Sequence, residues 1–296
     1  MLDPRRLLTF REVAKRASFS RAAEALALTQ PAVSQQVAAL EREVGAPLLD
    51  RRPGGLSLTE TGELLLAHAD ALSARLTAVD EQLGELRAGR DARLRVGAFP
   101  SALATIVPDA IAAHRAAEPD VAFEAGEGSS ADVAAGVRDG RLHVGVCFED
   151  AAAPPREHPD VRRHELGLEP MEAAVGPGHP LAGRRRIKLA ALAGDTWTAP
   201  SPDHLVYRAC VAAGFEPRID YLTRDPLAIR GLVAAGLAVT LTPRLLAGQL
   251  HGLRTIRLAG EAPSRRLYAL TPAVGARPRA GAFVDALRAA ARERTR

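Results

Sequence analysis

Polar side chains interrupt an otherwise apolar helical pattern between residues 19 and 40 of this 296-residue chain. The stretch reads FSRAAEALALTQPAVSQQVAAL, and Ser34 and Gln35 lie on a short polar face just after Pro31. A glutamine amide donates and accepts hydrogen bonds at once, so it can pair bidentately with adenine in the major groove of DNA. A serine hydroxyl can bond a phosphate or a base. This combination predicts recognition of double-stranded DNA.

Three short helices are expected to hold these groups, over about residues 5–17, 20–26 and 30–44. Ser20 and Thr29 are typical N-cap residues, and Pro31 suits the first turn of a helix because its missing N–H costs nothing there. Two helices joined by a turn of three or four residues form a helix-turn-helix unit. The third helix would pack its apolar stripe inward and keep the opposite face free. The stripe consists of Val33, Val37 and Leu40, and the free face of Pro31, Gln35, Ala38 and Arg42.

A turn-rich stretch, Arg51-Arg52-Pro53-Gly54-Gly55, follows between two apolar segments, residues 48–49 and 56–58. The pattern predicts a hairpin wing whose arginines lie along phosphates or enter a narrow minor groove. Residues 1–58 are therefore interpreted as a DNA-binding domain. A helical hairpin that serves only as a scaffold is the alternative.

Residues 59–88 contain no proline and are predicted to form one long helix with Thr59 as its N-cap. Apolar residues recur in it at alternating spacings of four and three, which is the heptad seam of a two-helix coiled coil. The interpretation is a dimer contact, and the alternative is a single helix packed on its own domain. The seam consists of Leu65, Ala69, Leu72, Leu76, Val79, Leu83 and Leu86.

Strand and helix patterns alternate from about residue 93 to the C-terminus, which indicates an α/β domain with largely parallel pairing. Strands are predicted near residues 94–98, 121–124, 143–148, 172–175, 197–199, 219–222, 238–241 and 266–271. Helices are predicted near residues 103–116, 131–139, 189–192, 205–213, 227–235 and 282–292.

The composition, 47% apolar and 25% charged, is typical of an ordinary globular protein, and a net charge of +4 does not by itself indicate a nucleic-acid partner. Neither a signal peptide nor an apolar stretch long enough to span a bilayer is recognisable, which favours a cytoplasmic protein.

Cys147 and Cys210 belong to no metal-binding pattern and are expected to be reduced and buried, with a redox pair as the alternative. No metal or cofactor is expected.

Residues 1–65 resemble the winged helix-turn-helix of the LysR-type transcriptional regulators. The resemblance is carried by Phe10, Ala14, Ser18-Phe19-Ser20-Arg21-Ala22-Ala23, Leu26, Thr29-Gln30-Pro31-Ala32-Val33-Ser34, Leu40-Glu41, Gly45, Leu48, Arg51 and Leu58-Thr59-Glu60-Thr61-Gly62. It implies a ligand-responsive regulator that binds promoter DNA as a homodimer or homotetramer. The residues expected at the DNA are Ser20, Arg21, Thr29, Gln30, Pro31, Ser34, Gln35, Arg51 and Arg52.

The chain departs from the family pattern at three places. Gln35 stands where the family often has Arg, which removes a bidentate partner for guanine and favours contact with adenine. Leu49 stands where Phe is frequent, and Gly54-Gly55 where the wing often has a basic residue. We therefore expect this chain to read a DNA site of its own.

The resemblance implies a multidomain α+β architecture with three parts. These are a winged helix-turn-helix over residues 1–58, a dimerising linker helix over 59–88 and an effector domain over 89–296. The effector domain would be similar to periplasmic binding proteins, with a small molecule held between two α/β subdomains. Subdomain I would cover about residues 93–160 and 268–296, and subdomain II about 165–265.

The effector cannot be identified from the sequence, but its chemical class can be addressed. In open parallel sheets ligands settle beyond the carboxyl ends of strands, often at helix N-termini. Ser101 and Ser201 each follow a predicted strand and are expected at such a terminus, where two hydroxyls suit a carboxylate or a similar anion. An ordinary N-cap is the alternative for each. The candidate effector-binding residues are Phe99, Pro100, Ser101, Ala102, Phe148, Pro200, Ser201 and Thr223.

Other polar groups have simpler interpretations. Ser129, three residues before Asp132, resembles a capping box. Asp203-His204 close to Ser201 raises a hydrolase as an alternative function, but a catalytic triad is assembled from distant segments, and no catalytic motif is present. An exported solute-binding protein is the second alternative, and it would need a signal peptide. An enzyme is therefore not expected.

Overall fold

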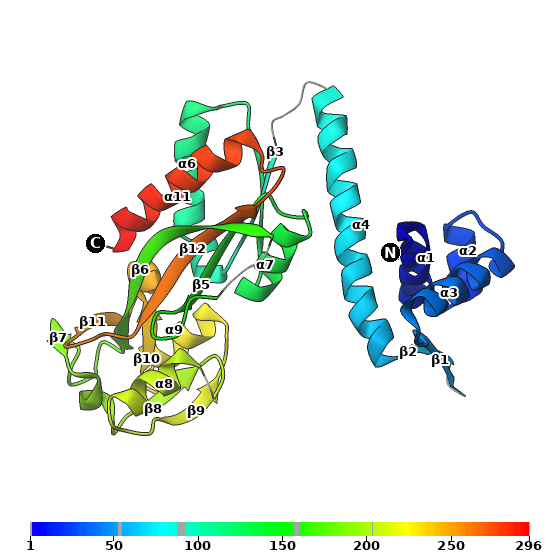
Figure 1. Ribbon diagram of the computed structural model, residues 1–296. Coiled ribbons are helices and arrows are strands. Elements are labelled where there is room, and N and C mark those ends of the chain that lie inside the picture. The colour runs from blue at the N-terminus through cyan, green and yellow to red at the C-terminus, as the bar shows by residue number, and fades with distance from the viewer. Residues whose placement is uncertain (1, 53–54, 88–92, 157–159, 203, 296) are drawn as a thin grey trace. The chain divides into compact units, whose positions relative to one another are not determined.

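The computed structural model describes residues 2–52, 55–87, 93–156, 160–202 and 204–295 (Figure 1). The chain divides into two units, one made by residues 1–91 and 139–141 and the other by residues 92–138 and 142–296. Within the described residues no helix is both long and apolar enough to cross a membrane.

The first unit contains the predicted three helices, the hairpin and the long helix. Its elements are α1 (Pro4–Arg16), α2 (Phe19–Ala25), α3 (Gln30–Val44), β1 (Leu49–Arg52), β2 (Gly55–Leu58) and α4 (Glu60–Arg87). Thr29 caps α3 as predicted, because its hydroxyl accepts a hydrogen bond from the Ala32 N–H over 3.4 Å. The cap predicted for α2 is wrong, since Ser18 and not Ser20 accepts the bond from the Arg21 N–H.

One hydrophobic core joins these elements. Val33, Val37 and Leu40 of α3 are buried in it together with residues of α1, α2 and α4, as the apolar stripe predicts. Gly62 in the first turn of α4 lies against the wing, because a Cβ at that position would come within 2.1 Å of the Leu48 carbonyl oxygen. Glycine is thus required where α4 approaches the backbone before β1.

The heptad seam along α4 has two different environments. Leu65, Ala69 and Leu72 pack against the core of the first unit, whereas Leu76, Val79 and Leu83 are 46%, 50% and 45% exposed. The side chain of Leu86 lies outside the described part. The interpretation of a helix packed on its own domain therefore holds for the first half of the seam, and the second half is exposed in the single chain.

The second unit is built on a sheet with the strand order β4-β3-β5-β12-β6-β11-β7, and β10 also pairs with β6. Its strands are β3 (Arg93–Ala98), β4 (Ala122–Glu127), β5 (Val144–Asp150), β6 (Val161–Val175), β7 (Arg186–Ile187), β8 (Thr196–Ala199), β9 (Arg218–Leu222), β10 (Thr240–Pro243), β11 (Arg254–Leu258) and β12 (Ser264–Pro272). Its helices are α5 (Pro100–Leu103), α6 (Ile106–Ala117), α7 (Ser130–Arg138), the 3₁₀-helix η1 (Leu189–Leu192), α8 (Leu205–Ala212), α9 (Pro226–Ala234), α10 (Arg244–Ala247) and α11 (Pro278–Thr295). The pairing is mixed, because β6 and β12 are antiparallel to their neighbours; the expectation of largely parallel pairing is wrong for this central part.

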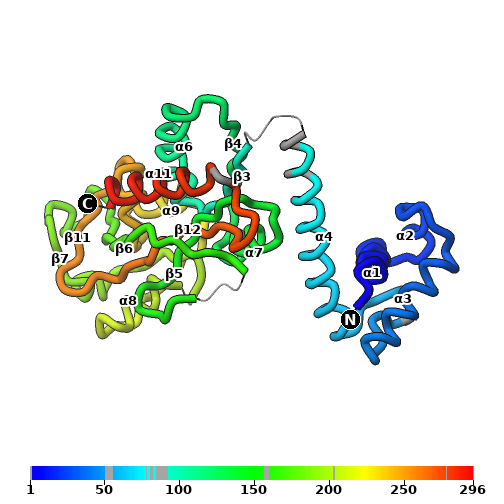
Figure 2. The backbone as a smooth tube through the Cα atoms, turned by 45° about the horizontal axis from the view of Figure 1, so that its top comes forward, coloured from blue at the N-terminus to red at the C-terminus, as the bar shows by residue number. Residues whose placement is uncertain are grey.

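The long strand β6 connects two subdomains. Residues 161–165 and 167–170 pair with β12, and residues 171–175 pair with β10 and β11 (Figure 2). Helices α6 and α11 cover one face of the first subdomain and α7 covers the other (Figure 1). The second subdomain has its own core around Trp197. The sequence prediction recognised only the last four residues of β6 and missed β7, β11 and α10.

The helix predicted over residues 103–116 is in fact two helices. Thr105 lies between α5 and α6, and its hydroxyl donates to the Ser101 carbonyl oxygen over 2.5 Å. This break leaves a short separate turn, α5, directly after β3, and α5 carries Ser101.

Candidate functional site

The exposed face of α3 carries the residues expected to read bases. Gln30, Pro31 and Gln35 are exposed, and Ser34 is half-buried beside them. Gln36, the other amide of this segment, instead accepts a 2.5 Å hydrogen bond from the Thr9 hydroxyl and so ties α3 to α1. The two neighbouring amides therefore have different roles: Gln36 is structural, whereas Gln35 points into solvent.

Two further candidates lie in the first turn of α2. Ser20 and Arg21 are both exposed. Since Ser18 provides the cap, the Ser20 hydroxyl is not used to hold the helix and can bond a phosphate. The Thr29 hydroxyl accepts the capping bond and retains its own proton, so it too can donate to a phosphate oxygen.

Arg51 and Arg52 lie on β1, and their Cα atoms are in register with those of Leu56 and Gly55 on β2. The hairpin predicted from the turn-rich stretch is therefore present. Pro53 and Gly54, which form the tip of the predicted wing, lie outside the described residues, as do the side chains of the two arginines.

Ser101 belongs to a buried charged cluster in the second unit. Arg265 on β12 donates from Nη2 to the Ser101 Oγ over 2.9 Å and from Nε to the Glu169 Oε2 over 2.9 Å. The other carboxylate oxygen of Glu169 accepts a 2.8 Å bond from the Leu245 N–H at the start of α10. All three side chains are buried. Burial lowers the pKa of Arg265, and the Glu169 carboxylate opposes this by attracting the guanidinium charge.

Two aromatic rings complete the cluster. Phe99 and Phe148 meet edge to face with their centroids 4.9 Å apart. The guanidinium carbon of Arg265 lies 5.0 Å from the centre of the Phe99 ring and 4.4 Å from that of Phe148. Both rings are therefore packed around a cation within the protein. Phe99 is fully buried and Phe148 is half-buried, so only Phe148 retains surface for a ligand.

The hydrogen-bond polarity at Ser101 follows from its partner. A guanidinium has only donors, so the Ser101 oxygen must accept from Arg265 and keeps its own O–H to donate. A ligand group at Ser101 would therefore be an acceptor, such as a carboxylate oxygen.

Ser201 does not have the position that the sequence predicts. Helix α8 begins at Leu205, and its N-cap is His204, whose Nδ1 accepts from the Val206 N–H over 3.4 Å. Ser201 lies four residues earlier in the connection after β8. Thr223 is brought to the same connection, because its N–H donates to the Ala199 carbonyl oxygen over 3.1 Å.

The remaining candidates have varied surroundings. Pro100 is exposed, Pro200 is half-buried, and Ala102 is buried in the core. The Ser129 hydroxyl accepts from the Asp132 N–H over 3.2 Å, which confirms the predicted cap. Both cysteines are buried, and burial raises the pKa of each thiol to about 12, so both are held as thiols.

Arg265 and Glu169 were not predicted from the sequence. The sequence feature that could have indicated them is a charged residue within an otherwise apolar strand pattern, as in the segments SRRLYAL and LEPMEAA. A buried charge needs a partner, but nothing in the sequence shows that these two strands are neighbours.

Comparisons with known proteins agree with this architecture. Residues 4–63 match the family model described as "Bacterial regulatory helix-turn-helix protein, lysR family", and residues 87–292 match "LysR substrate binding domain". The chain is 31% identical over 277 residues to the Hca operon transcriptional activator HcaR of Escherichia coli (strain K12), covering 89% of both chains. It is 30% identical over 268 residues to the transcriptional dual regulator GltC of Bacillus subtilis (strain 168), covering 88% of this chain and 87% of GltC.

Solved structures show the same fold. Full-length CbnR in complex with its target DNA has a TM-score of 0.66 at 24% identity, covering 98% of this chain and 100% of CbnR. ArgP from Mycobacterium tuberculosis has a TM-score of 0.69 at 23% identity, covering 98% of this chain and 97% of ArgP.

Proposed function

Because this chain belongs to the LysR family of transcriptional regulators, we propose that it reads promoter DNA through the exposed face of α3 and senses an anionic effector at Ser101. It is a ligand-responsive DNA-binding regulator and not an enzyme. Its functional domains would be residues 1–58, 59–88 and 89–296. Since its target is promoter DNA, it would act in the cytoplasm.

The observation that carries the DNA-binding role is the separation of faces on α3. The apolar stripe is buried and Gln36 is bonded to Thr9, so the side chains left for a groove are Gln35, Ser34 and the residues of the first turn. Gln35 would read an adenine. Ser20, Arg21 and Thr29 would contact the sugar–phosphate backbone and fix the position of the helix, and Arg51 and Arg52 would do so from the wing.

The full-length chain can be tested by selection from a pool of random DNA duplexes. We expect enrichment of a partly symmetric site with an adenine at a fixed place in each half, since a dimer presents two α3 helices. If the recovered sequences are unrelated and the affinity depends on salt but not on sequence, α3 does not recognise bases.

The anionic effector is supported by the Ser101–Arg265 pair. The available Ser101 O–H can donate to a carboxylate, and the Phe148 ring offers an apolar wall beside it. Pro100 and Ala102 flank this serine on α5, while Phe99 backs the cluster from within. Pro200, Ser201 and Thr223 would approach the ligand from the second subdomain, through the connection after β8.

Thermal shifts of the full-length chain with benzoate, glutarate and their amides would test the charge preference. We expect a carboxylate to raise the melting temperature more than its amide, and Ser101→Ala to abolish the difference. Ser57→Ala on the wing is the matched control and should keep it. If Ser101→Ala binds the carboxylate as well as the unaltered chain, Ser101 is not in the site.

The exposed second half of the α4 seam would form the dimer contact. Leu76, Val79 and Leu83 lie on one stripe of the helix, and pairing with a second copy would remove them from water. Sedimentation of the Leu76→Glu, Leu83→Glu double variant should shift the chain toward monomer. Glu24→Ala, an exposed change on α2, should leave the mass unchanged. A double variant that sediments like the unaltered chain would refute this contact.

The effector would act by binding one arrangement of the two subdomains more tightly than another, since a ligand shifts an equilibrium only through such a difference. Linkage then requires that DNA also changes the affinity for the effector by the same factor. Equal effector affinity with and without DNA would argue against coupling.

A further inference from the structure

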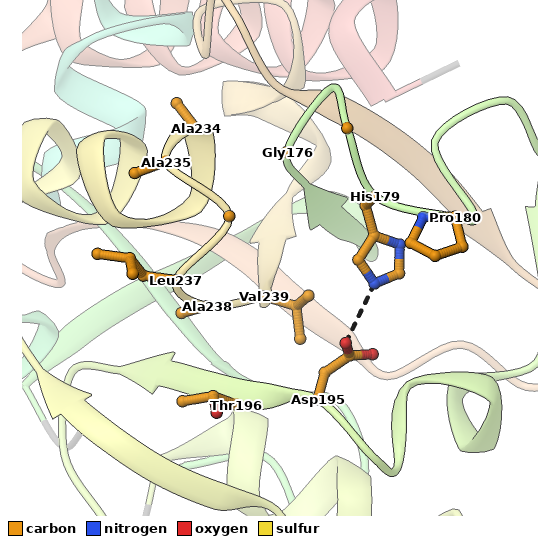
Figure 3. Close-up of a pocket in the computed structure, with 12 residues that line it drawn as sticks. Gly176, His179, Pro180, Asp195, Thr196, Ala234, Ala235, Leu237, Ala238 and Val239 are labelled. Atoms are coloured by element: carbon orange, nitrogen blue, oxygen red, sulfur yellow. Dashed lines mark hydrogen bonds and ion pairs between the residues drawn. The ribbon is translucent and has the colours of Figure 1, made fainter.

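A cavity of about 350 Å³ lies in the second subdomain and is lined by none of the candidate effector residues. It is formed by the loop after β6, the start of β8 and the segment that leads from α9 to β10 (Figure 3). Small-molecule sites have volumes of about 300–1,000 Å³, so this cavity can hold a small ligand.

A histidine and a carboxylate form one wall of the cavity. The Nδ1 of His179 accepts from the Leu181 N–H over 3.1 Å, which places the ring proton on Nε2. This Nε2 donates to the Asp195 Oδ1 over 3.1 Å (Figure 3). The second carboxylate oxygen, Oδ2, has no hydrogen bond to any residue that the structure describes. Asp195 is thus held in place by one oxygen and can receive a donor at the other.

The opposite wall is the C-terminal end of α9. Ala234 and Ala235 line the cavity there (Figure 3). The Gly231 and Val233 carbonyl oxygens accept from the Ala235 and Gly236 N–H groups, so this end contributes the negative pole of the helix dipole. Gly176 lies so close that a Cβ would be 2.6 Å from the Val233 carbonyl oxygen, so only glycine lets the loop approach the helix end. The cavity therefore has a full negative charge on one side and a partial one on the other.

No Lys or Arg among the described residues forms an ion pair with Asp195. Arg218 donates to the Thr196 hydroxyl, and its Nε lies 3.3 Å from an Asp220 carboxylate oxygen. Arg218 is thus engaged with other groups, and Asp195 has His179 as its only ion-pair partner among the described residues. Leu237, which is 51% exposed, and Val239 add apolar surface to the same cavity.

We propose that this cavity is a second ligand site, which binds a small organic cation. The ammonium group of the ligand would lie between Asp195 Oδ2 and the end of α9, with a short aliphatic part on Leu237 and Val239. This site differs from the effector site at Ser101 in position and in charge, because the site at Ser101 offers a hydroxyl donor and this one offers a carboxylate acceptor.

Titration of the full-length chain with n-butylammonium chloride at constant ionic strength, followed by calorimetry, tests the proposal. We expect saturable binding with one equivalent, and none with 1-butanol, which has the same butyl chain and no charge. This comparison needs no variant, so it does not depend on how a substitution folds. Equal binding of both compounds, or no saturation into the millimolar range, would overturn the proposal.

Variants then locate the site. Asp195→Asn should weaken n-butylammonium binding at least about tenfold, the effect of losing roughly 1.4 kcal/mol. Asp285→Asn on α11, which removes an exposed carboxylate elsewhere, should change it less than about twofold. A similar loss in both variants would indicate general attraction of cations. Since Ser101 and Asp195 share no contact, failure here leaves the effector proposal standing, and the reverse also holds.

Discussion

The polar residues of α3 and those around Arg265 differ in their exposure to solvent and in where their hydrogen-bond partners lie. On α3 the side chain of Gln35 is exposed and that of Ser34 is half-buried beside it. Arg265, by contrast, is buried and bonded to the buried Glu169 and Ser101. In the proposed role the first set has its partner outside the protein, so its loss should change binding and spare stability. The second set has its partners within, so its loss should first change stability. This difference can be tested at four positions.

The largest effect is expected for Glu169→Ala. It would leave the buried Arg265 without its counter-charge, which costs about 3–5 kcal/mol of unfolding free energy. Urea unfolding of the full-length chain measures this loss. Glu165→Ala, which removes an exposed carboxylate paired with Arg163, is the control and should cost less than about 1 kcal/mol. If both variants lose the same unfolding free energy, buried and exposed polar groups do not differ in their contribution to stability.

Acid should weaken the second unit through Glu149. Burial raises the pKa of this carboxyl, but hydrogen bonds from Arg163, from the Arg156 N–H and from Arg266 lower it from 4.5 to about 2. A lowered pKa stabilises the fold above the unfolded value of 4.5, and this contribution is lost as the pH falls from about 4.5 toward 2. Charged hydrogen bonds of this kind contribute about 1.5–3 kcal/mol.

Urea unfolding between pH 5 and 2 checks this expectation. Glu149→Gln should be less stable than the unaltered chain at pH 5 and should lose less stability on acidification. Glu124→Gln, which removes an exposed carboxylate paired with Arg93, should follow the unaltered chain. Parallel curves for all three would show that Glu149 does not set the acid response.

At the surface, Gln35→Ala should reduce discrimination between the selected DNA site and a mismatched one by about 1–3 kcal/mol, the value of a bidentate base contact. Its unfolding free energy should change by less than about 0.5 kcal/mol. Gln36→Ala should behave in the opposite way, because it loses the Thr9 bond and touches no base. Fluorescence anisotropy with both duplexes, together with urea unfolding, separates the two. If Gln35→Ala loses stability but not discrimination between the duplexes, Gln35 is structural and does not read a base.

The smallest effect is expected at Asp70 on α4, which pairs with Arg11 and Lys15 of α1. Burial raises its pKa, but the hydrogen bonds from Lys15 and Arg11 make the net shift a lowering. The pair is partly exposed, so Asp70→Asn should cost less than about 1 kcal/mol in urea unfolding. A larger loss would mean that surface pairs, and not only the apolar contacts of Leu65 and Leu72, hold α4 on the first unit.

The same contrast explains what the sequence could predict. The bounds of α3, its cap at Thr29 and its buried stripe depend on residues within four positions of each other, and all were predicted correctly. The bond from Arg265 to Ser101 joins residues 164 positions apart, and that to Glu169 joins residues 96 apart. Periodicity carries no information on such pairs.

The errors also have physical causes. Ser18 and Ser20 are both good caps, and only the backbone of Ser18, extended at φ −162°, decides between them. The first part of β6 was missed because charged residues such as Arg162, Arg163 and Glu165 break the apolar alternation. Ser201 was misplaced because its helix begins later, with His204 as an unusual cap.

The exposed half of the α4 seam has a consequence for how much of this regulator a cell must contain. If Leu76, Val79 and Leu83 are covered only by a second copy, as proposed, the amount of dimer rises with the square of the free chain concentration. Promoter occupancy would then respond steeply to the abundance of the regulator itself, even without any effector. Substitutions on this stripe would set the copy number at which the target genes respond.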